Sequence, residues 1–143
     1  MYKIREARSE DFPRIAAIHD DPGHIHLKME ASIEEQYFKS AVAADDIKMY
    51  VVEKSGLIAA FISFYIYHQK QTIFIDRLSI DNAYRKKGLD EHLYHKVERL
   101  AERIGMKRML TDIKVDDPDV YEFFERKGWK RSVQKDRYEI ELK

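Results

Sequence analysis

The chain has 143 residues, with 26 basic against 26 acidic side chains and therefore a formal net charge of zero. Its 44% of hydrophobic residues suffice for one buried core, which excludes a disordered chain and predicts a single domain over residues 1–143. Neutrality argues against nucleic-acid binding, and the lack of cysteine excludes disulfides, thiolate metal sites and a cysteine nucleophile. Neither a signal peptide nor a membrane span is expected, because the longest apolar run, 57–67, is shorter than the ~20 residues that a bilayer requires. We therefore expect a cytoplasmic protein.

The first half of the chain is expected to begin with a strand at 2–5, followed by two helices. Ser9 is placed to cap the first helix, and the Asp-Asp-Pro-Gly segment 20–23 ends it. Ser32 followed by Glu35 predicts a capping box that opens the second helix. An antiparallel meander of three strands is expected next, at 48–53, 57–67 and 72–80.

The second half contains the clearest helix, which begins after the loop 85–88 and which Gly105 ends. Its apolar residues are spaced three or four apart along one stripe, as a helix requires: Leu89, Leu93, Val97, Leu100 and Ile104. After it we expect a strand, a helix and two strands, at 107–113, 118–126, 129–133 and 137–142. The order β-α-α-β-β-β-α-β-α-β-β predicts a three-layer α/β (α+β) fold with a parallel crossover in a mixed central sheet.

The loop Arg85-Lys86-Lys87-Gly88 lies between a strand and the start of the long helix. A helix N-terminus carries about four unpaired N–H groups and roughly half a positive charge. Gly88 lets a ligand approach the backbone and three cations precede it, which suits a phosphate or pyrophosphate. The loop is neither a P-loop nor a dinucleotide fingerprint, because it has one glycine and no following Gly-Lys-Ser/Thr. These residues alone are also compatible with a solvated basic turn that caps a helix.

Two motifs, correctly ordered and spaced, resemble the GNAT acyl-CoA N-acyltransferases. The loop 85–90 is similar to motif A, a strand followed by Arg/Gln-x-x-Gly-x-Gly/Ala at a helix start. The segment 120–129, VYEFFERKGW, resembles motif B, which usually reads Ala-x-x-Phe-Tyr-x-x-x-Gly-Phe. The opening 4–7 and the element order agree as well, so the resemblance spans nearly the whole chain. It implies a GNAT-like fold with a cleft where strand four, 72–80, splays from strand five, 107–113.

The resemblance implies an acetyl-CoA-dependent N-acetyltransferase in which a primary amine attacks the thioester directly in a ternary complex. Acetyl-CoA is the expected cosubstrate, and no metal is expected. The pantetheine arm would pair with the backbone of strand four, and the pyrophosphate would bind the loop. The expected coenzyme-binding residues are Leu78, Ser79, Ile80, Arg85, Lys86, Lys87, Gly88, Leu89, Asp90 and Phe124. The acceptor, a small-molecule or peptide amine, is not specified by the sequence.

Two positions depart from the family's pattern. Asp90 replaces the last small residue of motif A, where its charge would repel a phosphate and its oxygens could accept N–H groups meant for the ligand. Phe124 stands where the family has the tyrosine that protonates the departing thiolate, and phenylalanine cannot donate a proton. These departures keep an alternative open: a catalytically weak or inactive acyl-CoA-binding or protein-interaction module on the same fold.

Catalysis would need a base for the protonated amine and an acid for the thiolate. Asp76 on strand four is the candidate base, and a merely salt-bridged or exposed acid is the other interpretation. Tyr121, three residues before Phe124, is either a substitute acid or a packing residue. The resemblance implies that the loop between the first two helices helps to form the acceptor pocket, with His24, His26 and Met29 as the expected contacts. Two histidines without a matched third ligand indicate exposed loop residues rather than a metal site.

Two further patterns bear on binding. The aromatic run 61–67 indicates either a sheet covered on both faces or an exposed aromatic surface through which a homodimer could form. The charges are unevenly distributed, because residues 84–110 carry 8 basic and 4 acidic groups whereas 1–83 carry 10 and 13. The positive surplus therefore lies on the loop and helix that are expected to hold the coenzyme's phosphates.

Overall fold

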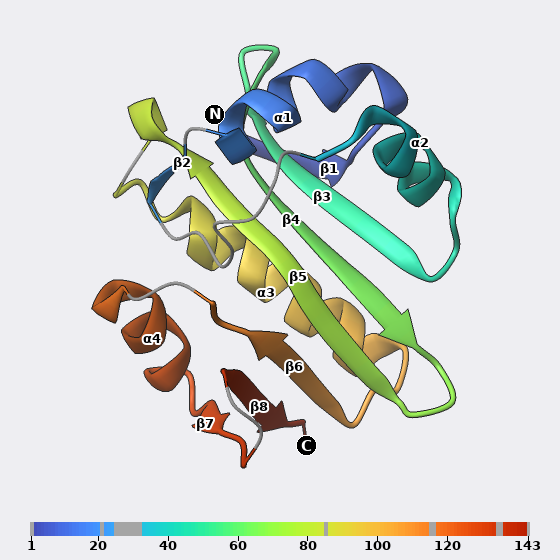
Figure 1. Ribbon diagram of the computed structural model, residues 1–143, viewed down its shortest axis with the longest axis vertical. Coiled ribbons are helices and arrows are strands. Elements are labelled where there is room, and N and C mark those ends of the chain that lie inside the picture. Colours follow the sequence, from blue (N-terminus) through green and yellow to red (C-terminus); the bar gives the residue numbers. More distant parts are fainter. Residues whose placement is uncertain are drawn as a thin grey trace.

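One mixed sheet organises the chain (Figure 1). The computed structural model describes residues 2–20, 22–24, 33–84, 86–114, 117–133 and 136–142, with the backbone alone for 22–24. The sheet order is β1-β3-β4-β5-β6-β8-β7, and a short strand, β2, pairs with β5 alone. The strands are β1 (Tyr2–Glu6), β2 (Pro22–His24), β3 (Ile47–Lys54), β4 (Leu57–Tyr67), β5 (Thr72–Asp81), β6 (Arg108–Asp112), β7 (Lys130–Arg131) and β8 (Arg137–Glu141). The helices are α1 (Phe12–Asp20), α2 (Glu35–Ala43), α3 (Leu89–Arg103) and α4 (Pro118–Glu125).

The central strands confirm the predicted meander and the predicted crossover. β4 is antiparallel to both β3 and β5 along most of its length. β5 and β6 are parallel and are joined through α3. Their pairing covers only Thr72–Ile75 of β5, although β5 continues to Asp81. The second half of β5 has therefore separated from β6, as the GNAT-like fold requires.

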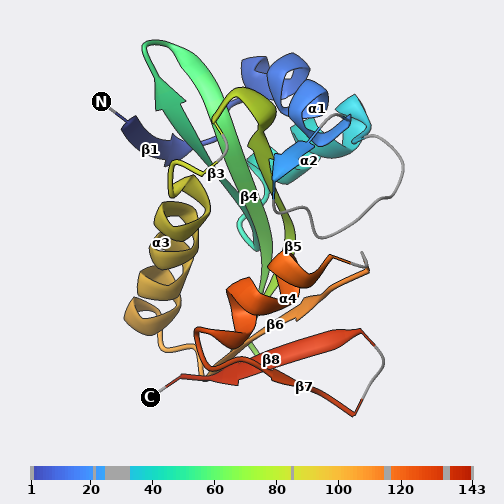
Figure 2. The same ribbon diagram turned by 90° about the vertical axis from the view of Figure 1, so that its left-hand side faces the viewer.

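Helices cover both faces of the sheet, and Figure 2 shows α3 on one side with α1 and α2 on the other. One core cluster joins the sheet to α3 and α4, and it includes Leu89, Leu93 and Val97 of the expected helical stripe. The stripe fades towards the end of α3, because Leu100 is only partly buried and Ile104 is 38% exposed. A second cluster joins β3 and β4 to α1 and α2, with Phe38 and Phe61 fully buried. Burying apolar residues on both faces is the main stabilising contribution in such a sheet. No helix among the described residues is long and apolar enough to cross a membrane.

Both predicted helix starts differ from the structure, in which the N-cap residues are Arg8 and Glu34. Ser9 begins a short 3-10 turn, Ser9–Asp11, and α1 follows it. α2 begins at Glu35 after an extended Glu34 with no side-chain cap, whereas Ser32 lies outside the described residues. The sequence also gave no indication of β2, because three residues carry no periodicity and their partner strand lies far along the chain.

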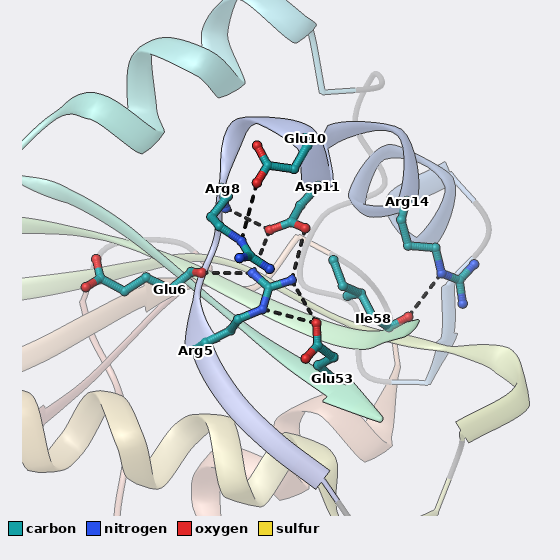
Figure 3. Close-up of polar contacts among 8 residues, drawn as sticks. All are labelled: Arg5, Glu6, Arg8, Glu10, Asp11, Arg14, Glu53 and Ile58. Atoms are coloured by element: carbon teal, nitrogen blue, oxygen red, sulfur yellow. Dashed lines mark hydrogen bonds and ion pairs between the residues drawn. The ribbon is translucent and has the colours of Figure 1, made fainter. Parts of the chain in front are cut away.

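A partly buried ion-pair network fixes the start of α1 on β1 and β3 (Figure 3). The Arg5 guanidinium donates to both carboxylate oxygens of Asp11, at 2.8 and 3.0 Å, and to Glu53 Oε2 at 3.1 and 3.2 Å. Asp11 Oδ2 also accepts the Arg8 N–H at 2.7 Å. Burial raises the pKa of Asp11, but the hydrogen bonds from Arg5 and Arg8 together outweigh it and hold that pKa below its ordinary value.

Candidate functional site

β5 changes its pairing at Asp76, in the middle of the strand. Ser63 of β4 lies opposite Arg77, and the next residue of β4, Phe64, lies opposite Ile75. Asp76 is therefore the extra residue of a β-bulge, a feature that bends a strand and increases its twist. The ladder with β6 ends at the same place, where Thr111 Oγ1 donates to the Ile75 carbonyl at 2.9 Å. The bulge and the separation of the two strands coincide.

Beyond the bulge lie the three residues that were expected to pair with the pantetheine arm. Leu78 and Ile80 are buried in the cluster that contains α3, and Ser79 is fully buried. Their strand leads through a 3-10 turn, Asn82–Tyr84, towards the loop before α3. β2 lies along part of this strand, with His24 opposite Ile80 and Pro22 opposite Asp81.

The loop before α3 has the geometry expected of a phosphate site. Gly88 is the N-cap of this 15-residue helix, with a left-handed φ of 76° and no side-chain cap. A Cβ at Gly88 would meet nothing within 4 Å, so the backbone is open to a ligand. Lys86 and Lys87 are exposed beside it. These residues fit a phosphate group, because the first-turn N–H groups and nearby cations are its usual partners; Arg85 lies outside the described residues.

Acidic side chains also occupy the first turn of α3. Asp90 Oδ1 accepts the N–H of Glu91 at 2.9 Å, so the carboxylate does take a helix N–H group, as the sequence suggested. Glu91 Oε1 accepts from Lys127 Nζ at 2.7 Å and lies 3.6 Å from Arg126 Nη2. The charge of Glu91 is therefore compensated by two cations that directly follow α4.

Asp76 belongs to a buried polar group on the face that α1 covers. Its side chain is 8% exposed, and Asp76 Oδ2 lies 3.5 Å from Arg77 Nε. Arg77 Nη1 donates to Nε2 of His19, which is 3% exposed on α1, at 3.1 Å. Arg77, whose side chain is 15% exposed, is thus a partly buried partner of the candidate base. Sequence reasoning missed His19, although its place four residues after the buried Ile15 puts both on one helix face.

A tyrosine pair borders this group. The Tyr37 and Tyr65 hydroxyls form a hydrogen bond between α2 and β4. Burial, this hydrogen bond and the charge of Asp76 all raise the pKa of Tyr65. Tyr65 also packs against Phe74 and Tyr67, and Tyr67 is 46% exposed. The aromatic run therefore has covered faces at 61–64 and a partly exposed end, so a homodimer stays a prediction.

The other expected site residues make packing contacts of their own. Phe124 is fully buried, with its ring centroid 4.9 Å from that of Trp129 and 6.5 Å from that of Tyr94. Tyr121 is half-buried and packs against Tyr138, with the Arg131 guanidinium over both rings. The packing interpretation of Tyr121 matches these contacts. The residues expected to contact the acceptor lie in β2 or outside the described chain: His24, His26 and Met29.

Several solved structures share this fold. The comparison with curated protein sequences finds no match. Among solved structures, the chain is similar to ribosomal-protein-S18-alanine N-acetyltransferase from Escherichia coli (TM-score 0.83, 14% identity, covering 99% of this chain and 94% of that one). It is also similar to PaiA N-acetyltransferase from Thermoplasma acidophilum in complex with coenzyme A (TM-score 0.84, 13% identity, 99% of both chains). A third similar structure is spermidine N-acetyltransferase SpeG from Vibrio cholerae, an N152L mutant (TM-score 0.76, 12% identity, 98% and 93%). At these identities the likeness concerns the fold.

The family is assigned from the sequence rather than from the fold. The family model described as "Acetyltransferase (GNAT) family" matches residues 1–129, which include both motifs and the whole of β5. This match covers far more than half of the chain and agrees with the separation of β5 from β6. The chain therefore belongs to the GNAT acetyltransferase family.

Proposed function

We propose that this protein is an acetyl-CoA-dependent N-acetyltransferase that transfers an acetyl group to a primary amine by direct attack in a ternary complex. One observation carries the proposal. β5 loses its partner β6 at Ile75, yet it continues to Asp81 and leads into the cationic loop before α3. An extended backbone edge that ends at a phosphate site matches a ligand with a pantetheine arm and a pyrophosphate. We also propose a cytoplasmic location.

Different residues of the chain would bind the coenzyme and transfer the proton. The edge of β5 beyond Asp76 would orient the arm, and the N–H groups at Leu89 and Asp90 with Lys86 and Lys87 would hold the phosphates. The coenzyme supplies an activated thioester when bound. Asp76 would accept a proton from the acceptor amine, and burial beside Arg77 would exclude competing water.

The proposal is tested by incubating the protein with acetyl-CoA and a panel of small amines and peptides. Product masses and free-thiol release would be followed together. Acetylated product with matching thiol release is expected for at least one acceptor. Thiol release no faster than without protein, in a preparation that binds coenzyme A in calorimetry, would contradict transferase activity and favour a binding module. The fully buried Phe124, in place of a proton donor, is the observation that favours that second candidate.

The role of Asp76 is tested by Asp76→Asn, which keeps the side-chain size and removes the base. Once an acceptor has been identified, the acetyl-transfer rate of Asp76→Asn is expected to be lower than that of the wild type by on the order of 10²–10⁴-fold, and its pH profile is expected to change. Asp45→Asn on an exposed turn is the matched control and should leave the rate unchanged. An unchanged rate and pH profile in Asp76→Asn would show that the carboxylate is only structural.

A further inference from the structure

We propose that β2 is a strap that the protein holds across its own coenzyme cleft, so that β2 and the pantetheine arm bind the same edge of β5 in turn. The inference rests on the proposed function, because it concerns the edge to which acyl-CoA would bind. It adds a property that the proposed function does not include: in the free protein this edge is already paired with the protein's own chain.

The edge that β2 uses follows from the strand register. A strand has two edges, and β4 occupies one of them, with Ala60 opposite Ile80. β6 uses the other edge, but only as far as Ile75. Because β2 pairs with Ile80 and Asp81, it must lie on the edge that β6 leaves. Figure 1 agrees, since β2 and β6 both lie on the side of β5 opposite β4.

Two chains cannot occupy this edge together. Paired backbones lie about 4.8 Å apart, so a second extended chain at Ile80 would overlap the first. Leu78, Ser79 and Ile80 are the residues expected to pair with the arm, and β2 covers the last of them. Coenzyme binding at full length therefore requires that β2 leave Ile80.

The pairing between β2 and β5 is also weak enough to be released. β2 meets β5 at two register positions with an irregularity between them, whereas β4 is aligned with β5 at eight. One of the two positions is Pro22, which has no backbone N–H to donate. A short ladder with a bulge and a proline is a weak one. If the strap is closed for about nine-tenths of the time, the apparent affinity for coenzyme is about tenfold below that of the open cleft.

An engineered disulfide tests the strap directly, and the natural chain contains no cysteine that would interfere. Pro22 and Asp81 lie directly opposite each other, and opposite residues in an antiparallel pair have Cα atoms about 4.5–5.5 Å apart, within disulfide range. The double variant Pro22→Cys with Asp81→Cys would be oxidised, checked by mass spectrometry, and titrated with coenzyme A. Each single variant is a matched control, because Asp81→Cys alone removes the ion pair with Arg14.

The oxidised double variant is expected to bind coenzyme A about a hundredfold more weakly or not at all, and reduction should restore the affinity of the single variants. Failure of the disulfide to form would refute the pairing, and equal affinity of oxidised and reduced protein would refute the competition. Absence of coenzyme binding in the wild type and in every variant would overturn the proposed function instead, and the strap with it, since β2 would then exclude nothing.

Discussion

Replacing Asp90 by asparagine removes one negative charge from the first turn of α3 and keeps an oxygen that can accept the Glu91 N–H. A carboxylate about 5 Å from a phosphate charge repels it by roughly 3 kcal/mol at an effective dielectric of 20. Lys86, Lys87 and dissolved salt would offset about half of this. We therefore expect Asp90→Asn to strengthen coenzyme A binding by about 1.4 kcal/mol, which is tenfold in Kd.

Isothermal titration with coenzyme A at low and high ionic strength is the assay, and the gain should shrink as salt increases. Asp90→Gly separates charge from hydrogen bonding, because it also frees the Glu91 N–H, at a helix-stability cost of about 1 kcal/mol. Asp45→Asn, which removes the same charge from a distant turn, is the control and should change little. Unchanged affinity in both Asp90 variants would refute the reasoning and would mean that the carboxylate points away from the phosphates.

Two predictions concern stability. Asp11→Asn should lower the free energy of unfolding by about 2–4 kcal/mol at pH 7, because it weakens the bonds to Arg5 and to the Arg8 N–H. The folded-state pKa of Asp11 lies below its unfolded value, so this stability is present above about pH 4 and is lost as the pH falls through the folded pKa. Urea unfolding curves of the two proteins should converge in acid, and a gap that persists there would contradict the linkage. Tyr94→Phe should cost about 1–3 kcal/mol, because Trp129 Nε1 donates to the Tyr94 hydroxyl at 2.8 Å. Trp129 is the only tryptophan, so its fluorescence follows this unfolding, and an unchanged midpoint would show that the indole finds another acceptor.

Much of the fold could be predicted because local spacing decides it. The apolar stripe from Leu89 to Val97 placed α3, and Gly105 and Gly128, with φ of 80° and 93°, end segments where the sequence suggested. Alternation and turn residues located the meander to within a residue or two. Such features depend on neighbours in the chain, which the sequence lists in order.

The missing parts depend on neighbours in space. β2 exists only because β5 offers an unpaired edge nearly sixty residues further along the chain. The contact of the partly buried Arg77 with His19 needs α1 to lie on β5. In the same way, Phe124 could be recognised as a departure from the motif, but its burial against Trp129 and Tyr94 comes from the packing of α4 on α3.

The bulge at Asp76 also constrains how the chain length of β5 can vary. Ile73 and Ile75 face α3, and so do Leu78 and Ile80, which are out of step with the first pair by one residue. If the same residues alternated without a bulge, Arg77 and Asp81 would turn into the apolar core and Leu78 towards α1. Single-residue deletions among relatives of this protein should therefore fall at the bulge, where loss of the extra residue leaves Ile75 and Leu78 on the same face, and should be avoided elsewhere in β5, where they would turn one half of the strand over.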